Sequence, residues 1–215
     1  MRTAIIGVGN IGRTIAGHLA AGGERVILAA RETPEALARE LGDLASAAPV
    51  PEAIRTGDVV IFAVWFDVMK RLIGQNQGQL AGKVVVDTSN PVTEDEKGEL
   101  CGTLPEGVSS GSVIAGLVPA SAHFVKAFGT LSAASLKKAE NRTPKRAVLF
   151  YATDDRRAQT AIERLISASG FDPMRAGGIG AAIRIEVYGD LHEYGGLNGK
   201  LVDAQEARTA IAGRG

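Results

Sequence analysis

The sequence predicts an α/β fold in which helices cover both faces of a doubly wound, mostly parallel sheet. Short runs rich in valine and isoleucine alternate with longer segments of helical spacing along most of the 215 residues, and this alternation is typical of a parallel sheet. One run, residues 84–86, is three valines between a lysine and an aspartate, as expected of a strand buried on both faces. A chain of this length buries roughly 70% of its unfolded surface, so its core needs no disulfide.

The predicted strands are short apolar or β-branched runs. In chain order they are Arg2–Ile6, Arg25–Ala29, Ser46–Ala47, Val59–Val64, Lys83–Asp87, His123–Ala127 and Arg146–Tyr151. Most segments between them have the spacing of amphipathic helices. We expect those helices at Ile11–Ala21, Pro34–Leu41, Pro51–Arg55, Asp67–Ile73, Ser112–Leu117, Ala133–Glu140 and Arg156–Ser169.

The chain becomes less regular after Phe171. We expect a short helix at Ala181–Val187, a glycine-rich loop at residues 189–199 and a last helix at Asp203–Ala212. No linker composition divides the chain. The sequence therefore predicts one domain at residues 1–170 and a small C-terminal extension at residues 171–215 that is not an independent domain.

Composition narrows the class of protein. The 24 basic and 24 acidic residues balance, which argues against nucleic acid or a membrane surface as a partner. The single cysteine, Cys101, fits a reducing compartment. The longest apolar run, Val59–Phe66, is too short to span a bilayer, and no signal segment precedes the first strand. We expect a cytoplasmic protein without a metal site.

The segment from Gly7 to Gly12 carries the clearest chemistry. Gly7, Gly9 and Gly12 form a G-x-G-x-x-G between a predicted strand and a predicted helix, which is the context of a dinucleotide-binding fingerprint. Gly7 permits a tight turn, Gly9 lets the backbone approach a pyrophosphate, and Gly12 lets the helix pack closely on the sheet. The free N–H groups at the helix start favour an anion. The alternative is a glycine-rich turn without a ligand.

The second strand indicates which dinucleotide binds. An acidic residue at its end would bind the ribose hydroxyl of NAD and repel the 2′-phosphate of NADP. This strand ends Ala29-Ala30-Arg31 instead, and Arg31 can hold the phosphate with its planar guanidinium. The alternative is an exposed loop arginine. Thr33 either adds a hydroxyl contact or caps the following helix.

Ligands of open α/β sheets bind beyond the carboxyl ends of the strands, and several side chains there are candidates. Ser89 and Asn90 could bind the nicotinamide and its ribose, or could form a plain turn. Lys126 could contact the acceptor or a ribose, or could be solvated. Trp65 could form an apolar wall, or could pack in the core. His192 could donate a proton or a hydrogen bond to substrate, or could be a surface or dimer-contact residue.

Four segments, taken in order, resemble the coenzyme F420-dependent NADP oxidoreductase family. They are Gly7–Gly12, Ala30-Arg31, Ser89-Asn90-Pro91 and Val125-Lys126-Ala127-Phe128. The resemblance runs over about residues 2–185. It implies a Rossmann domain with a small C-terminal lobe, usually dimeric. It also implies that NADP(H) lies across the strand ends, with a flavin-like acceptor (F420, FMN, FAD or a related ring) over the nicotinamide.

The family pattern implies a set of cofactor-binding residues in this chain. Asn10 and Ile11 would lie on the pyrophosphate, Arg31 on the 2′-phosphate, and Asn90 and Pro91 near the nicotinamide. The full set is Gly7, Val8, Gly9, Asn10, Ile11, Gly12, Arg31, Ala63, Val64, Ser89, Asn90 and Pro91. Ala63 and Val64 would lie on the adenosine side. No catalytic residue is identified, and the candidates for the substrate side are Trp65, Lys126, Arg184 and His192.

The chain departs from the family pattern at identifiable positions. Val8 stands where threonine is common, Ala30 where serine is common, and Trp65 where a proline is common. The loop at residues 189–196 is also absent from the archetype. We expect the C-terminal extension to cover the substrate cleft, to contact a second subunit of a homodimer, or both.

Two further functions remain compatible with these residues. One is the reduction of a small imine or keto substrate, although enzymes of that kind usually carry a long helical dimerisation domain and only a short stretch follows Ser169 here. The other is a non-catalytic protein that senses NADP(H). The leading hypothesis is an NADPH-dependent oxidoreductase, because hydride transfer to a flavin-like ring needs no protein nucleophile.

Overall fold

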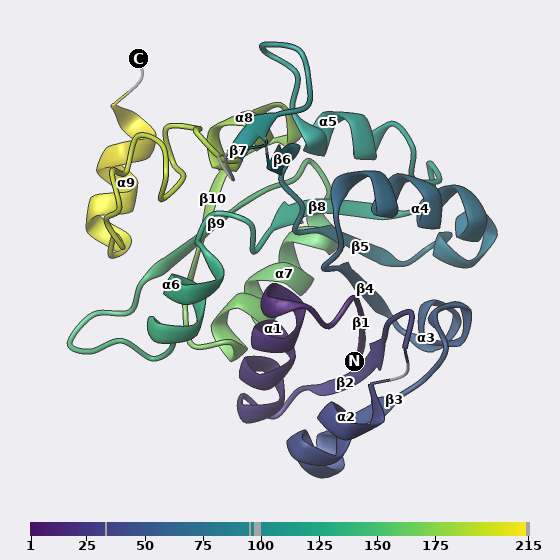
Figure 1. Cartoon of the computed structure of the whole chain (residues 1–215). Coiled ribbons are helices and arrows are strands. Elements are labelled where there is room, and N and C mark those ends of the chain that lie inside the picture. Colours follow the sequence, from purple (N-terminus) through teal and green to yellow (C-terminus); the bar gives the residue numbers. More distant parts are fainter. Residues whose placement is uncertain (33, 95, 97–99, 214–215) are drawn as a thin grey trace.

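The computed structural model describes residues 1–32, 34–94, 96 and 100–213. In this part of the chain eight strands form one sheet in the order β3-β2-β1-β4-β5-β8-β9-β10 (Figure 1). The strands are β1 (Arg2–Ile6), β2 (Arg25–Ala29), β3 (Ala45–Ala47), β4 (Val59–Phe62), β5 (Val84–Asp87), β8 (His123–Ala127), β9 (Val148–Ala152) and β10 (Asp172–Gly177).

The direction of the strands confirms the predicted doubly wound, mostly parallel sheet. The neighbouring strands β3, β2, β1, β4, β5 and β8 run parallel to one another. β9 pairs antiparallel with β8, and β10 runs parallel to β9. The strand order reverses at β1, with β2 on one side and β4 on the other. Such a reversal is where ligands bind in open α/β sheets.

Helices cover both faces of this sheet (Figure 1). Their bounds are α1 (Asn10–Ala21), α2 (Glu35–Leu41), α3 (Val50–Thr56), α4 (Phe66–Leu80), α5 (Ser110–Ala115), α6 (Ala133–Lys138), α7 (Arg156–Ala168), α8 (Ala182–Ile185) and α9 (Ala204–Ala212). Helices α1, α6 and α7 share one core with Ile5 of β1. Helices α3, α4 and α5 share another with Ile6. Neighbouring residues of a strand point to opposite faces, so β1 contributes to both cores.

Helix α4 is longer than the predicted segment Asp67–Ile73, because it continues to Leu80. Its buried positions are Phe66, Met69, Ile73, Asn76 and Leu80, which are three or four residues apart as one helix face requires. Two glycines and a run of polar residues hide this periodicity in the sequence. Asn76 has non-helical angles (φ −126°, ψ 20°), so the helix is irregular where its composition is least helical.

Strand β10 is an element that the sequence pattern does not predict. It contains Pro173 and few apolar residues, and a proline is tolerated only at a sheet edge. β10 is such an edge, because its one partner in the sheet is β9. The expected boundary at residue 170 falls just before this strand, so residues 172–177 are part of the sheet. The segment that follows them, with α8 and α9, packs on β9 and β10.

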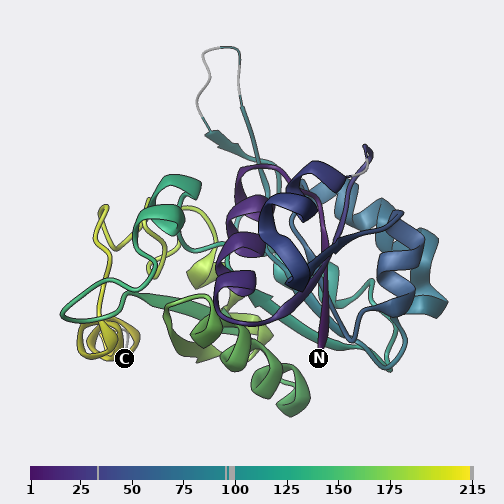
Figure 2. The same cartoon turned by 90° about the horizontal axis from the view of Figure 1, so that it is seen from below.

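A second unpredicted element is a small hairpin after the turn that follows β5. Strands β6 (Val92–Glu94) and β7 (Leu100–Gly102) pair antiparallel, and the hairpin projects from the body of the molecule (Figure 2). Cys101 lies in β7 and is exposed. Strands of three residues with charged neighbours give no clear alternation, which is why the pattern misses them.

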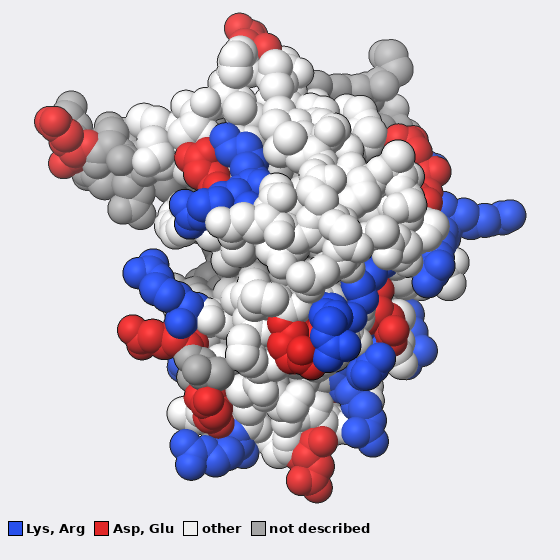
Figure 3. Space-filling view, turned by 90° about the vertical axis from the view of Figure 1, so that its right-hand side faces the viewer, with Lys and Arg blue, Asp and Glu red and all other residues white. Residues whose placement is uncertain are grey.

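The surface seen in Figure 3 has a broad uncharged area above a mixed one. Two parts of the sequence contain no charged residue, residues 72–82 in α4 and its end and residues 107–122 around α5. Below the uncharged area, positive and negative side chains lie among one another on this face. Among the described residues no helix is both long and apolar enough to cross a membrane, and no cluster of His, Cys, Asp and Glu could hold a metal ion.

Candidate functional site

The turn from β1 into α1 lies against the end of β4. Gly7 has φ +99°, a region that favours glycine, and its N–H donates to the carbonyl of Ala29 at 2.7 Å. A β-carbon at Gly7 would lie 2.3 Å from the carbonyl oxygen of Ala63, and one at Gly12 would lie 2.0 Å from that of Gly7. The chain's own atoms therefore require glycine at both positions.

Gly9 differs from its two neighbours in the motif. Its backbone angles (φ −67°, ψ −167°) suit any residue, and a β-carbon there would meet no protein atom within 4 Å. Helix α1 begins directly afterwards with no capping side chain and no acidic residue in its first turn. The protein's own packing does not explain a glycine at this position. An open backbone next to a helix N-terminus fits a pyrophosphate.

The other predicted nucleotide residues lie around this turn. Val8, Ile11 and Ala63 are half-buried against the core on the α1 face, and Val64 packs against the opposite core. Asn10 is exposed at the start of α1. The four apolar residues therefore line the turn on both sides, and Asn10 lies on its exposed side.

Two exposed side chains flank the same edge of the sheet. Arg31 is exposed just after β2, and Trp65 is 65% exposed at the start of α4. Thr33 lies outside the described residues. Because β2 and β4 lie on either side of β1, Arg31 and Trp65 lie on opposite sides of the turn from β1 into α1.

The turn after β5 is held by hydrogen bonds from its own side chains. The backbone N–H and the hydroxyl of Ser89 each donate to Oδ1 of Asp87 at 2.7 Å. Nδ2 of Asn90 donates to the carbonyl of Gly129 at 3.0 Å, and its Oδ1 accepts the N–H of Val187 at 2.8 Å. Asn90 therefore joins this turn to the segment after β8 and to the segment after α8, and Pro91 follows at the base of the hairpin.

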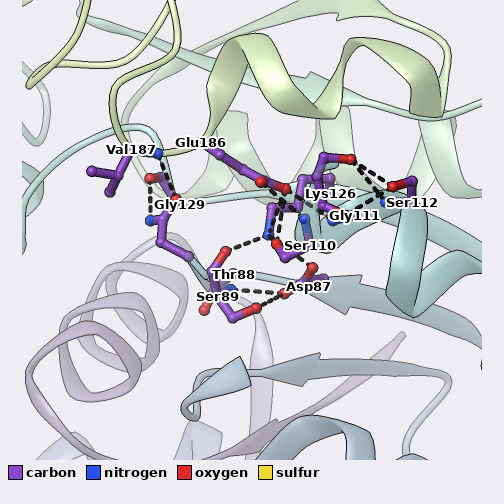
Figure 4. Close-up of polar contacts among 12 residues, drawn as sticks. Asp87, Thr88, Ser89, Ser110, Gly111, Ser112, Lys126, Gly129, Glu186 and Val187 are labelled. Atoms are coloured by element: carbon purple, nitrogen blue, oxygen red, sulfur yellow. Dashed lines mark hydrogen bonds and ion pairs between the residues drawn. The ribbon is translucent and has the colours of Figure 1, made fainter. Parts of the chain in front are cut away.

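A buried ion cluster lies beneath this turn (Figure 4). We call it the Lys126 cluster; its members are Asp87, Ser89, Ser110, Lys126 and Glu186. Nζ of Lys126 donates to Oδ2 of Asp87 at 2.8 Å, to the hydroxyl of Ser110 at 2.6 Å and to the carbonyl of Ser89. Its side chain is 1% exposed. All three ammonium hydrogens are thus used inside the protein.

Glu186 completes the Lys126 cluster from the C-terminal side. Its carboxylate lies 3.5 Å from Nζ of Lys126. It accepts the N–H groups of Ser110 and Gly111 at 2.9 Å each and the Ser110 hydroxyl at 2.8 Å. These two N–H groups begin α5, where the helix dipole favours a negative charge. The cluster therefore ties β5, β8, α5 and the end of α8 together.

His192 is buried behind the turn after β5 that carries Ser89, Asn90 and Pro91, which we call the Asn90 turn. A carbonyl can only accept, so Nε2 of His192 carries the hydrogen and donates to Gly129 at 3.0 Å, while Nδ1 accepts the N–H of Tyr194 at 3.0 Å. Burial lowers the pKa of His192, against the opposing effects of the Gly129 carbonyl and Glu193. The ring is therefore neutral near pH 7, and both of its nitrogens are used internally.

Arg184 binds within the C-terminal segment. Its guanidinium pairs with Asp190 at 2.8 Å and reaches the carbonyl of Ile211 at 3.3 Å. Of the four residues predicted for the substrate side, Lys126 and His192 are buried and Arg184 is paired with a carboxylate. Trp65 presents most of its ring to solvent.

The sequence analysis missed the partners of Lys126, which are Asp87, Ser110 and Glu186. One signal could have found the first of them. Strands β5 and β8 are neighbours, and their register pairs Asp87 with Lys126, so two opposite charges at matching ends of two predicted strands indicate a buried pair. No comparable signal exists for Glu186, which is separated from Ser110 by 76 positions.

Comparison with known proteins agrees with the motifs. Residues 2–91 match the family described as NADP oxidoreductase, coenzyme F420-dependent. The metalloreductase STEAP3 of Rattus norvegicus is 32% identical over 185 residues, which are 86% of this chain and 36% of that protein. The chain thus spans about a third of the length of this relative.

Two solved structures share the fold over most of their length. A hypothetical protein of Sinorhizobium meliloti is 29% identical with a TM-score of 0.78, over 89% of this chain and 93% of that one. A protein of Arthrobacter described as a candidate F420-dependent NADP reductase is 24% identical with a TM-score of 0.71, over 85% and 87%. The family resemblance predicted from the motifs is therefore confirmed over residues 2–91.

Proposed function

We propose that this chain, whose residues 2–91 match the coenzyme F420-dependent NADP oxidoreductases, transfers hydride between NADP(H) and a flavin-like acceptor such as F420, FMN or FAD. The observation that carries the proposal is the open position at Gly9 beside the uncapped start of α1. The fold itself explains Gly7 and Gly12 but not Gly9. A pyrophosphate seated on that backbone accounts for the third glycine.

The neighbouring residues have roles consistent with this assignment. The Gly7–Gly12 turn and the first N–H groups of α1 would hold the pyrophosphate, and Arg31 would pair with the 2′-phosphate. Ala63 and Val64 would line the adenosine side. Asn90 and Pro91 would lie near the nicotinamide. The turn that contains these two residues is fixed by the Lys126 cluster. NADPH, when bound, supplies the hydride, and these residues orient it.

The fixed hydrogen bonds of the candidate acids favour a flavin-like acceptor over an imine or keto substrate. Reduction of a C=O or C=N bond leaves charge on oxygen or nitrogen and draws on a nearby proton donor. Lys126 and His192 are both committed to internal partners. Hydride transfer to a flavin-like ring gives a reduced anion that the ring itself stabilises, so a protein acid is not needed.

Nucleotide preference tests the first half of the proposal. We expect NADPH to bind more tightly than NADH, and Arg31→Ala to weaken NADPH binding roughly tenfold to a hundredfold, since a hydrogen bond to a charged group contributes about 1.5–3 kcal/mol. NADH binding should not change. Arg39→Ala, which removes an exposed arginine from α2, is the matched control. Equal affinity of the wild type for both nucleotides would refute the preference.

An acceptor panel tests the second half. NADPH oxidation is followed with F420, FMN, FAD and ferric chelates, and with small imines and keto acids. The proposal expects turnover with the ring acceptors. Turnover restricted to imines or keto acids would support the alternative reductase, and tight NADPH binding without turnover on any acceptor would support the non-catalytic sensor.

The proposal extends to a cytoplasmic homodimer, as the family pattern implies. The C-terminal residues after β10 are the segment expected to cover the cleft or to contact the second subunit. Sedimentation of the full chain should give twice the mass of 22.3 kDa, and fractionation of cells should place it with the cytoplasmic proteins. A monomer would leave cleft covering as the role of this segment.

A further inference from the structure

Tyr188 has a backbone conformation that an aromatic residue rarely adopts. Its φ is +69°. It is the third residue of a turn that the N–H of Gly189 closes on the carbonyl of Glu186 at 2.8 Å. Glycine or asparagine is favoured at such a position, because a side chain there meets its own backbone. A tyrosine at this place is a steric cost that the fold accepts.

Close packing on both sides holds the turn in this conformation. Before Tyr188, the Glu186 side chain is fixed in the Lys126 cluster and the N–H of Val187 is bound by Asn90. After it, a β-carbon at Gly189 would lie 2.3 Å from the carbonyl oxygen of Arg184, and one at Gly195 would lie 1.9 Å from that of Gly189. The backbone of Tyr188 is therefore imposed by its neighbours.

Tyr188 lies next to the turn that carries Asn90. The N–H of Val187 donates a hydrogen bond to Asn90 of the turn after β5. Figure 4 shows Val187 beside Gly129 and above that turn. The α-carbon of Tyr188 follows about 3.8 Å further along the chain. The side chain of Tyr188 is 59% exposed, so packing in the core does not account for it.

We propose that Tyr188 is a binding residue for the acceptor, and that its ring stacks on a planar conjugated ring of the flavin type. The inference rests on the proposed function and names the residue that would recognise the acceptor. Because the backbone of this turn is already held, little backbone entropy is lost when the ring stacks, and offset stacking of rings is favourable. Trp65, exposed at the start of α4, is a second aromatic beyond the carboxyl ends of the strands.

Tyr194 is a contrasting residue in the same segment. Its side chain is 52% exposed, but its φ is not positive, and its ring centroid lies 5.8 Å from that of His192. Loss of this ring removes an aromatic of similar exposure without changing the turn that holds Tyr188. Tyr194→Ala is therefore the matched control.

The test is binding of a planar ring to the full chain saturated with NADP⁺. Quenching of FMN or F420 fluorescence is titrated for the wild type and for Tyr188→Phe, Tyr188→Asn, Tyr188→Gly and Tyr194→Ala. We expect the Phe and Ala variants to bind as the wild type does. The Asn and Gly variants should bind about threefold to tenfold more weakly. Their unfolding temperatures should stay equal or rise, because asparagine and glycine suit the positive φ.

The outcomes separate this inference from the proposed function. If the wild type binds NADP⁺ and a ring, and Tyr188→Gly binds both equally well, the stacking role is wrong while the function stands. If the wild type binds NADP⁺ but neither ring, the flavin-like acceptor is wrong and the stacking role falls with it. If Tyr188→Gly changes the oligomeric mass with no change in ring affinity, Tyr188 is a contact between copies of the chain.

Discussion

A methyl group at Gly9 should separate nucleotide binding from folding. In Gly9→Ala the new β-carbon meets no protein atom within 4 Å, and the backbone angles suit alanine. Alanine is a poorer N-cap than glycine by about 0.5–1 kcal/mol, while the loss of chain freedom in the unfolded state gives back about 0.4–1 kcal/mol. The unfolding temperature should thus change by less than about 4 °C.

The same methyl group should weaken NADPH binding strongly. It occupies the space in which a pyrophosphate approaches the backbone, and each hydrogen bond lost to a charged oxygen costs about 1.5–3 kcal/mol. The loss of one such bond corresponds to roughly a tenfold to hundredfold weaker affinity. Isothermal titration with NADPH measures this, and thermal unfolding without nucleotide, followed by circular dichroism, measures stability.

Two further glycines serve as controls for Gly9→Ala. In Gly12→Ala the β-carbon would lie 2.0 Å from the carbonyl oxygen of Gly7, so this variant should lose about 1–3 kcal/mol of stability or more. Gly74→Ala places its β-carbon in open space on α4 and should stabilise the helix by up to about 1 kcal/mol without changing affinity. If Gly9→Ala binds NADPH as tightly as the wild type, the pyrophosphate does not lie on this turn and the reasoning fails.

Two other predictions concern buried groups. Lys126→Met leaves the carboxylates of Asp87 and Glu186 without their cation, which should lower the free energy of unfolding by about 3–5 kcal/mol. The unfolding temperature should fall by roughly 6–20 °C. An unchanged temperature would contradict the Lys126 cluster as described. Burial lowers the pKa of His192 and of His18 below the usual 6.5, so the unfolded chain binds more protons once the pH falls below that value. The unfolding free energy should be highest above pH 6.5 and should fall towards pH 5.5, with each histidine contributing up to about 1.4 kcal/mol per pH unit. In His192→Gln this decline, measured by urea unfolding, should be shallower, and an equal slope would argue against a buried neutral ring.

The central strands and the turn from Gly7 to Gly12 were predictable because short-range signals specify them. Val84–Val86 is apolar throughout, and Gly7, Gly9 and Gly12 stand at a spacing with a known steric purpose. β10 was not predictable, since an edge strand tolerates Pro173 and needs no continuous apolar run.

Lys126 shows where sequence reasoning ends. A lysine after an apolar run is compatible with solvent or with a ligand, and its burial depends on carboxylates from distant segments. Asp87 can be inferred as a partner, because β5 and β8 are neighbouring strands and bring it opposite Lys126. Glu186 is not, because its place depends on how the residues after β10 pack over the sheet. The same is true of His192, whose two hydrogen bonds arise only after that packing.

The Asn90 turn also has a consequence for the order of events during synthesis. Its hydrogen bond to Val187 spans 97 positions of the chain. At about 5–20 residues per second, the ribosome needs roughly 5–20 s to make the partner of Asn90 after Asn90 itself. The turn from Gly7 to Gly12, proposed to hold the pyrophosphate, can form with the first strands, whereas the Asn90 turn, proposed to lie near the nicotinamide, lacks its fixed geometry until the chain is nearly finished. A nascent chain would therefore be able to hold the phosphates of a dinucleotide well before it could orient the reactive ring.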